Sequence, residues 1–223
     1  MSYILNIETA TKNCSVALAK NGQTLLCKEI AEQGYSHAER LHVFIEEILK
    51  ESKVTFQDLD AIAVSKGPGS FTGLRIGVSA AKGFCFALEI PLISIDTLTI
   101  LANQLKVESG IIVPMIDARR MEVYSAVFNS NIEKTREVEA EILTEESFAN
   151  YNETIHFIGD SNDKAKSILT KTSFVFHDEI VFPSAKEMSA LSYNKFQNQD
   201  FEDVAYFEPY YLKDFMITSK PVI

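Results

Sequence analysis

The order of apolar and polar residues predicts that the chain opens with three short β-strands. The apolar segments lie at residues 3–8, 14–19 and 24–30. Asn21-Gly22 separates the second segment from the third, and this pair is typical of a tight β-hairpin. We therefore expect an antiparallel three-stranded meander at the start of the chain.

Helical spacing replaces strand spacing from residue 37 onward. Apolar residues recur three and four positions apart over residues 37–52, which predicts an amphipathic helix. Strands are expected at residues 61–65 and 92–95, and helices at residues 72–88 and 97–105. The first half of the chain thus combines a meander with alternating strands and helices, which is typical of a mixed α/β sheet.

The second half of the chain repeats this order less regularly. Strands are expected at residues 111–116, 123–128, 155–158 and 172–176, and helices at residues 142–151, 162–169 and 185–196. Two similar units in one chain indicate a duplicated α/β fold. A polar break at residues 106–110 separates them, so we predict domains at residues 1–108 and 109–200. An aromatic-rich tail, residues 201–223, is expected to pack back.

Charge and cysteine content narrow the range of functions. Lys and Arg number 21 and Asp and Glu number 31, which gives a net charge of −10. Because nucleic acids are bound largely through Lys and Arg, the chain is not expected to hold RNA alone. Cys14, Cys27 and Cys85 are odd in number and far apart, so neither a disulfide framework nor a zinc site is indicated.

The apolar segments are too short to suggest a membrane protein. None approaches the 18 residues that a spanning helix needs, and the first residues do not resemble a secretory leader. We therefore expect a cytoplasmic protein without a membrane span.

Five of the nine glycines fall within one segment, SKGPGSFTGLRIGVSAAKG, at residues 65–83. A glycine-rich turn between a strand and a helix often binds phosphate. Gly67 and Gly69 begin a dinucleotide motif, but Thr72 stands where its third glycine belongs, and the P-loop pattern is absent. From the residues alone, a phosphate loop and a tight turn that caps a helix both remain open.

Candidate nucleophiles and metal ligands do not form a recognisable site. Ser70 is not part of a G-x-S-x-G motif, which argues against a serine hydrolase. His37 and His42 are five residues apart, so on a regular helix they point about 140° apart. His156 and His177 are isolated in the sequence. We therefore expect no metal site.

Three strings within the first 128 residues resemble the bacterial TsaB (YeaZ) family. They are ILNIETATKNCSVAL, SKGPGSFTGLRIGVSAAKG and PMIDARRMEVYSAVF, and their order and spacing match as well. Beyond residue 128 the resemblance is reduced to length and a Pro-Tyr-Tyr-Leu segment at residues 209–212. The resemblance implies an actin-like ATPase (ASKHA) fold, in which two ribonuclease-H-like α/β domains carry mixed sheets.

The resemblance also implies a role in tRNA modification. Members of this family are non-catalytic partners of a paralogue, TsaD, which transfers a threonylcarbamoyl group to the adenosine beside the tRNA anticodon. A small ATPase, TsaE, joins the assembly. By this resemblance the chain forms a heterodimer with a TsaD-like protein and meets tRNA only through the complex. A homodimer remains open for the chain alone.

In active relatives two turns hold the phosphates of a nucleotide, and both are altered here. The positions that correspond to them are Thr9, Ala10, Thr11, Asp117 and Arg119. Ala10 stands where a glycine would let the backbone approach phosphate. The helix over residues 97–105 also lacks the His-x-x-x-His metal pair of TsaD. We therefore expect no catalytic residue, metal or cofactor in the isolated chain. ATP or ADP at an interface shared with other subunits remains open.

A partner surface is expected on the two long helices of the first domain. The helix from residue 72 is small or apolar on nearly every side, so something must bury it. In the resembling family these helices pair with their TsaD counterparts in a four-helix bundle; the alternative is that they cover only the protein's own sheet. The residues assigned to the interface are Leu41, Phe44, Ile45, Ile48, Gly73, Ile76, Gly77, Ala80, Ala81 and Phe84.

Two other functions stay open from the sequence. The first is a free-standing enzyme of the actin-like class, such as a small-molecule kinase or a metallopeptidase-like hydrolase. The altered phosphate turns and the missing histidine pair argue against it. The second is a homodimeric binding module with another client, which would use the same helices.

Overall fold

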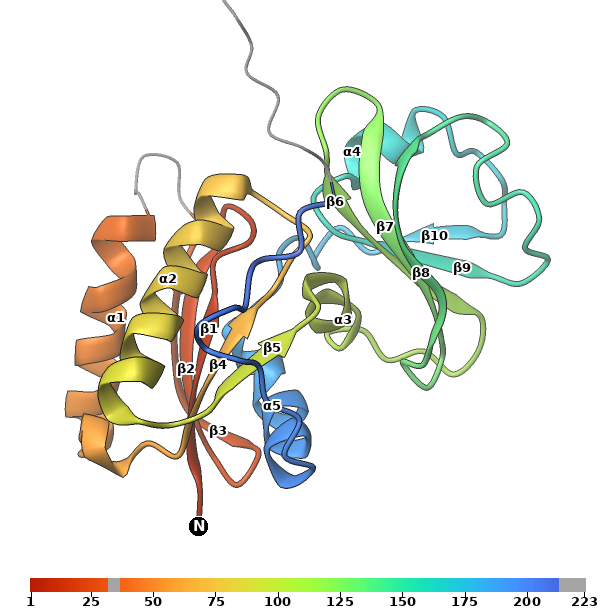
Figure 1. Ribbon diagram of the computed structural model, residues 1–223. Helices are drawn as coiled ribbons and strands as arrows, with labels where there is room; N and C mark the ends of the chain where they lie inside the picture. The colour runs from red at the N-terminus through yellow and green to blue at the C-terminus, as the bar shows by residue number, and fades with distance from the viewer. Residues whose placement is uncertain (32–36, 213–223) are drawn as a thin grey trace, which may run out of the picture.

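The structure, a computed structural model, describes residues 1–31 and 37–212, which form two lobes (Figure 1). The first lobe is built on a sheet of order β3-β2-β1-β4-β5, and the second on a sheet of order β10-β9-β6-β7-β8. When the second sheet is listed from β8 to β10, its order β8-β7-β6-β9-β10 corresponds strand by strand to the order of the first sheet. The duplicated α/β unit expected from the sequence is therefore confirmed.

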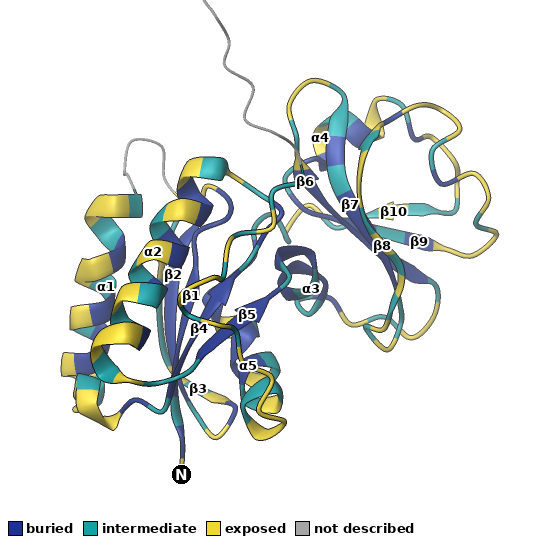
Figure 2. Ribbon diagram, in the orientation of Figure 1, coloured by how far each residue is buried: buried dark blue, intermediate teal, exposed yellow. Residues whose placement is uncertain are grey.

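The first sheet begins as the expected meander. Its antiparallel strands are β1 (Tyr3–Glu8), β2 (Cys14–Lys20) and β3 (Gln23–Ile30). β4 (Ala61–Ser65) and β5 (Leu92–Ile95) continue the sheet parallel to β1. β1, β2, β4 and β5 are buried on both faces, which explains why their sequences are nearly unbroken apolar segments (Figure 2).

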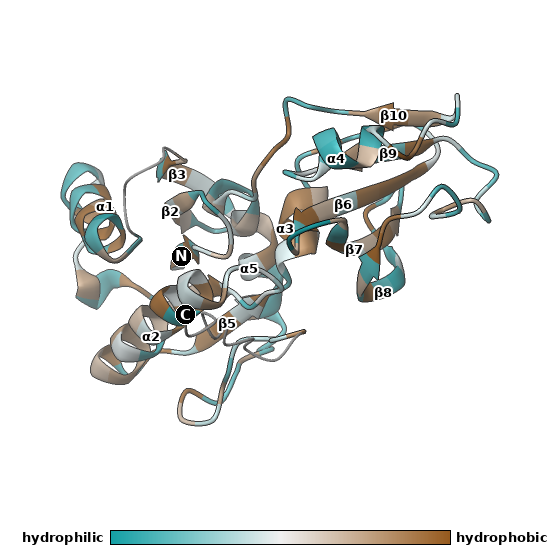
Figure 3. Ribbon diagram, turned by 90° about the horizontal axis from the view of Figure 1, so that it is seen from above, coloured by the Kyte–Doolittle hydropathy of each residue, from teal (hydrophilic) through white to brown (hydrophobic). Residues whose placement is uncertain are grey.

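Two long helices cover one face of the first sheet. α1 (His37–Ser52) and α2 (Phe71–Leu88) lie side by side on it (Figures 1 and 3). Their inward side chains, among them Leu41 and Val78, form one apolar core with the sheet. A short 3₁₀ helix, η1 (Phe56–Asp58), lies between α1 and β4. Burial of one apolar stripe of each helix is what stabilises this arrangement.

The end of the chain covers the other face of the first sheet. A short 3₁₀ helix, η2 (Ala185–Glu187), leads into α5 (Met188–Gln197). Met188 packs with Ile4 and Ile93 of the sheet. The predicted domain limits of 109–200 therefore need correction, because these helices belong to the first lobe. They supply the apolar cover that the second face of the sheet requires.

Beyond α5 the chain runs along the edge of the first sheet as a strap, residues 200–212. The Glu202 N–H donates a hydrogen bond to the Leu92 carbonyl (2.8 Å). Lys82 of α2 donates to the carbonyls of Ala205 (3.2 Å) and Phe207 (2.8 Å). The strap thus covers the exposed edge of β5. Residues 213–223 of the predicted tail lie outside the described part of the chain.

The second sheet is flanked by shorter helices. Its strands are β6 (Ile111–Asp117), β7 (Glu122–Asn129), β8 (Lys134–Ile142), β9 (Ile155–Ile158) and β10 (Phe174–Phe176). α3 (Thr97–Ala102) lies between the lobes (Figure 3) and packs on this sheet through Leu98 and Leu101. α4 (Asn162–Lys166) covers the other face. No helix within residues 1–31 and 37–212 is long and apolar enough to cross a membrane.

The second half of the chain differs from the expectation in several elements. The helix predicted over residues 142–151 is absent, and successive turns replace it, in which Ser147 N donates to Thr144 O and Ala149 N to Glu146 O. β8 was not expected, because charged residues interrupt its few apolar ones. It forms because it completes a ladder with β7. α3 and α4 also end before their predicted ends at residues 105 and 169.

Candidate functional site

The first hairpin turn, between β1 and β2, is packed against the beginning of α2. Thr9 and Ala10 are fully buried. Thr9 Oγ1 donates a hydrogen bond to the Gly73 carbonyl (2.8 Å), and the Ser70 N–H donates to the Ala10 carbonyl (2.6 Å). The Thr9 hydroxyl and the Ala10 carbonyl are thus bonded to α2 and its N-cap, in a turn that corresponds to an altered phosphate loop.

The glycines of residues 65–83 make this packing possible. A Cβ atom at Gly69 would lie closer than 3.0 Å to the Ala10 carbonyl oxygen, and one at Gly73 equally close to that of Thr9. A Cβ at Gly77 would meet Thr9 Oγ1 in the same way. Glycine is required because the helix and the turn touch directly. The glycine-rich segment therefore allows α2 and the loop before it to pack directly against the first hairpin turn.

A buried carboxyl group, Glu8, lies at the end of β1 beneath this turn. Its Oε1 accepts a hydrogen bond from the Ala10 N–H (2.6 Å), and Ser65 at the end of β4 lies beside it. Burial raises the pKa of Glu8 from 4.5 to about 7, although the Ala10 N–H and Ser65 oppose the rise. At neutral pH a large share of Glu8 is therefore protonated.

The second hairpin turn, between β6 and β7, is exposed and bonded to α4. Lys164 of α4 pairs with Asp117 and donates a hydrogen bond to the Arg120 carbonyl (3.1 Å). The Arg119 N–H donates to Asp117 Oδ1 (3.0 Å), and the Asp117 N–H donates to Asp160 Oδ1 (2.8 Å). Asp117 and Arg119 therefore hold the turn in shape.

Asp160 is a residue of this turn region that the sequence reasoning missed. Burial raises the pKa of Asp160, whereas the Asp117 N–H and the charges of Lys12 and Lys164 oppose the rise. Lys12 belongs to the first turn, so the two turns are near enough for their charges to interact. The only signal for Asp160 in the sequence is its place just after the segment that forms β9.

The four histidines lie at two places in the fold. His37 and His42 belong to α1, and His37 Nε2 is hydrogen-bonded to the Thr11 carbonyl oxygen (2.7 Å). His156 and His177, isolated in the sequence, come together, with Nδ1 of the first 3.0 Å from Nε2 of the second. Within the described residues, no group of three or more His, Cys, Asp or Glu side chains is arranged to hold a metal ion.

Ser70, Cys14 and Cys85 lie in environments that favour a structural role over a catalytic one. Ser70 caps α2, because its Oγ accepts a hydrogen bond from the Gly73 N–H (3.3 Å). Burial raises the pKa of Cys14 to about 11 and that of Cys85 to about 12. Both thiols are thus protonated at neutral pH, and a protonated thiol is a poor nucleophile.

Most of the residues assigned to the partner interface lie inside the first lobe. The buried ones are Leu41, Ile45, Ile48, Gly73, Gly77 and Ala81. Their assignment needs correction, because each faces the protein's own sheet or first turn. The remaining four are partly exposed and pack against the margin of the same core: Phe44, Ile76, Ala80 and Phe84.

The outer side of α2 carries exposed residues that the sequence reasoning missed. Phe86 is 81% exposed, and a Cβ atom at Gly83 would have no neighbour within 4 Å. We call this surface the α2 outer face and define it by Ile76, Ala80, Gly83, Phe86 and Ala87. Ile76, Ala80, Gly83 and Ala87 are three or four positions apart. The sequence therefore carries a second stripe of apolar or small residues, which could have indicated this surface.

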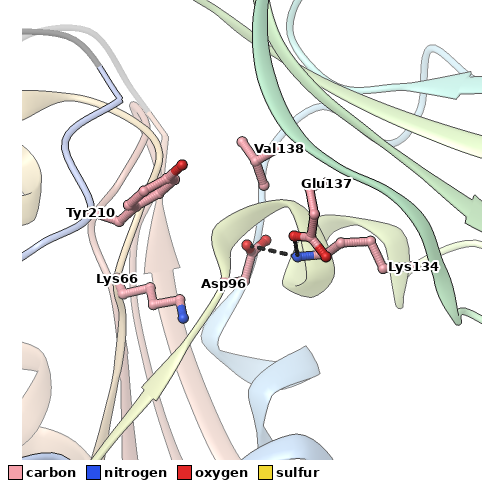
Figure 4. A pocket seen from close by; sticks show the side chains of 6 residues that line it. All are labelled: Lys66, Asp96, Lys134, Glu137, Val138 and Tyr210. Atoms are coloured by element: carbon pink, nitrogen blue, oxygen red, sulfur yellow. Dashed lines mark hydrogen bonds and ion pairs between the residues drawn. The ribbon is translucent and has the colours of Figure 1, made fainter.

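A pocket opens between the lobes beyond the ends of β4 and β5 (Figure 4). Its volume is ≈ 270 Å³, and it is lined by Lys66, Asp96, Lys134, Glu137, Val138 and Tyr210. Lys134 of β8 pairs with Asp96 (3.1 Å) and Glu137 (3.4 Å). The pocket cannot be recognised from the sequence, because its residues come from four separate segments of the chain.

Comparisons with known proteins place the chain in a family. A family model described as TsaD, tRNA N6-adenosine threonylcarbamoyltransferase, matches residues 26–217. The chain is 30% identical over 220 residues to tRNA threonylcarbamoyladenosine biosynthesis protein TsaB of Escherichia coli (strain K12), covering 95% of this chain and 94% of that one. It is 40% identical over 121 residues to tRNA N6-adenosine threonylcarbamoyltransferase of Bacillus anthracis, covering 47% of this chain and 35% of that one.

The similarity extends to three dimensions. The structure of YeaZ from Pseudomonas aeruginosa matches with a TM-score of 0.80 at 27% identity, covering 95% of this chain and 100% of that one. Both lobes are included, so the expected actin-like ATPase fold is confirmed. Because the family model spans most of the chain and a relative named TsaB matches nearly its whole length, this chain belongs to the TsaB (YeaZ) family, which is related to TsaD.

Proposed function

We propose that this chain is a non-catalytic subunit in the biosynthesis of threonylcarbamoyladenosine in tRNA, and that it binds a TsaD-like paralogue through the α2 outer face. Family membership supports the pathway, because the full-length relative is named for it. The observation that carries the partner role is the exposed apolar surface of α2, where Phe86 is 81% exposed. Exposed apolar patches of this kind commonly bind another protein.

The two hairpin turns support a non-catalytic role. In the first, Thr9 and Ala10 are buried and bonded to the beginning of α2. In the second, Asp117 is paired with Lys164. Neither residue set offers the free glycine-rich backbone with which phosphate is usually held. A nucleotide would therefore bind only within the complex. In this proposal a TsaE-like ATPase and tRNA also join through the complex, in the cytoplasm.

The shape of the α2 outer face fits a helix of a related protein. Gly83 and Ala80 are small, so a partner helix can approach the α2 backbone closely. Phe86 adds a large apolar side chain beside them, of the kind that dominates binding energy in interfaces. A paralogue with the same fold carries a corresponding helix pair, and two similar surfaces can pack about an approximate two-fold axis.

Two variants of the α2 outer face test this proposal. Phe86→Asp places a charge in the surface, and Gly83→Leu fills the space beside the backbone. Ile142→Asp is the matched control, since Ile142 is also exposed (67%) but lies on β8 in the second lobe. We expect both α2 variants to weaken binding of the TsaD-like paralogue from the same organism at least ten-fold, measured by calorimetry, which corresponds to about 1.4 kcal/mol.

The melting temperatures of the three variants should stay close to that of the wild type, because none of the changed side chains is buried. Wild-type affinity in both α2 variants would contradict the proposal. A second copy of the chain is the competing partner for the same surface. If the α2 variants abolish self-association, seen by light scattering, but leave paralogue binding unchanged, the surface is a homodimer interface instead.

A further inference from the structure

We propose that the pocket between the lobes binds the anionic group of a small molecule, a carboxylate or a phosphate, through Lys66 and Tyr210. The site belongs to this chain alone and does not depend on partner binding. It is formed by the loop after β4, the beginning of α3, β8 and the strap, all of which contribute side chains (Figure 4).

The position of the pocket favours a ligand site. β1, β4 and β5 are parallel, and Lys66 and Asp96 directly follow the carboxyl ends of β4 and β5. In α/β folds ligands bind beyond these strand ends, and often between two lobes. The volume of ≈ 270 Å³ is below the range of about 300–1,000 Å³ for pockets that hold drug-sized ligands. The occupant is therefore small.

The charges of the pocket leave one cation available. Lys134 is shared by two carboxylates, those of Asp96 and Glu137. Within the described residues, by contrast, Lys66 has no carboxylate within ion-pair distance, and its amino group points toward the pocket (Figure 4). An oxyanion that enters the pocket would meet this ammonium group, and charge-assisted hydrogen bonds are the stronger ones.

The backbone around Lys66 is fixed before any ligand binds. The Lys66 N–H donates to the Ile95 carbonyl (2.8 Å), and the Lys66 carbonyl accepts from the Tyr210 N–H (2.7 Å). Gly67, with φ +113°, allows the strap this close, because a Cβ there would lie 2.6 Å from the Tyr210 carbonyl oxygen. Tyr210 is thereby held in the wall beside Lys66. A wall ordered in advance lowers the entropic cost of binding.

The opposite wall restricts what the ligand can be. Val138 offers an apolar contact, and Glu137 lies at the outer rim with its side chain 85% exposed. Carboxylates at the rim repel an extended polyanion such as RNA, so the geometry fits a small molecule with a single anionic end. That end would face Lys66, and an uncharged part would face Val138.

The test uses the full chain, with inorganic phosphate and acetate as separate probes. Amide resonances of a ¹⁵N-labelled sample are followed during titration. We expect one or both probes to shift the resonances of residues 66, 95–97 and 210, with saturation. Phosphate alone would assign a phosphate site, and acetate alone a carboxylate site. If neither probe moves these resonances, the proposal is overturned.

Lys66→Met and Tyr210→Phe identify the groups that bind, since each keeps the bulk of its side chain. Lys106→Met is the control, because it removes the same charge from a surface residue outside the pocket. We expect Lys66→Met to weaken binding at least ten-fold, Tyr210→Phe several-fold, and Lys106→Met not at all. Equal weakening by Lys66→Met and Lys106→Met would show only a general charge effect and overturn the proposal.

Discussion

Gly77→Ala is predicted to destabilise the first lobe although alanine is the better helix former. A Cβ atom at residue 77 would lie closer than 3.0 Å to Thr9 Oγ1 and 3.4 Å from Thr9 Cβ. Thr9 cannot simply turn away, because it is fully buried and its Oγ1 donates to the Gly73 carbonyl (2.8 Å). Either α2 moves outward, or this hydrogen bond is lost.

The expected size follows from two opposing terms. Overpacking of a buried site costs roughly 1–3 kcal/mol, and alanine in place of glycine within a helix gains about 1 kcal/mol. The net loss in the free energy of unfolding relative to the wild type is therefore about 0–2 kcal/mol, and relative to Gly83→Ala it is about 1–3 kcal/mol. For a chain of this length each kcal/mol lowers the melting temperature by about 2–4 °C, so Gly77→Ala should melt up to about 8 °C below the wild type and roughly 2–12 °C below Gly83→Ala.

Calorimetric melting of Gly77→Ala beside Gly83→Ala tests this reasoning. Gly83 is the matched control, because it lies in the same helix with no atom within 4 Å of a Cβ. Its variant should melt slightly above the wild type. Thr9→Ala combined with Gly77→Ala should cost less than the sum of the single changes, since the clashing oxygen is gone. If Gly77→Ala melted as high as Gly83→Ala, the contact between α2 and the first turn would be refuted.

Two further predictions concern Glu8 and the strap. The folded pKa of Glu8, about 7, lies above its ordinary value of 4.5, so the folded state binds more protons between these values. The contribution of Glu8 to the free energy of unfolding therefore falls as the pH rises through this range, by on the order of 3 kcal/mol. Glu8→Gln should remove this dependence in urea denaturation at pH 5 and pH 8, and an unchanged dependence would show that another group titrates. Lys82→Met removes the hydrogen bonds to the Ala205 and Phe207 carbonyls, each worth about 1 kcal/mol. Together they amount to about 2 kcal/mol, so amide hydrogens of residues 203–211 should then exchange about thirty-fold faster while those of α2 stay protected. Unchanged slow exchange in the strap would contradict this role for Lys82.

The strands and helices of the first lobe could be predicted because the pattern of apolar residues in each element matches the faces of that element that are buried in the fold. β1, β4 and β5 are mainly apolar, as is typical of strands buried on both faces, and α1 has a single clear apolar stripe. β8 could not be found, since its charged sequence makes sense only beside β7. The helix expected over residues 142–151 does not form, because Leu143 and Phe148 enter the core of the second lobe from a series of turns.

The site was harder to predict than the fold, because the spacing of small residues along a helix does not show which neighbour that face of the helix contacts. Gly73 and Gly77 share one stripe of α2 with Ala81, and small residues at this spacing suit a partner helix as well as the protein's own turn. Only the position of Thr9 decides between them. The pocket residue Lys66 lies within the glycine-rich segment and Lys134 lies in no motif, so the fold alone brings these two residues together.

The return of the chain to the first lobe makes the second lobe an insertion. All five strands of the first sheet have been synthesised by Ile95, but one face stays uncovered until η2 and α5 follow. The second lobe is contiguous and can fold meanwhile as a unit. During translation, the lobe that begins first is therefore completed last. A truncation before residue 185 would accordingly expose the core around Ile4 and Ile93, at the opposite end of the sequence from the cut.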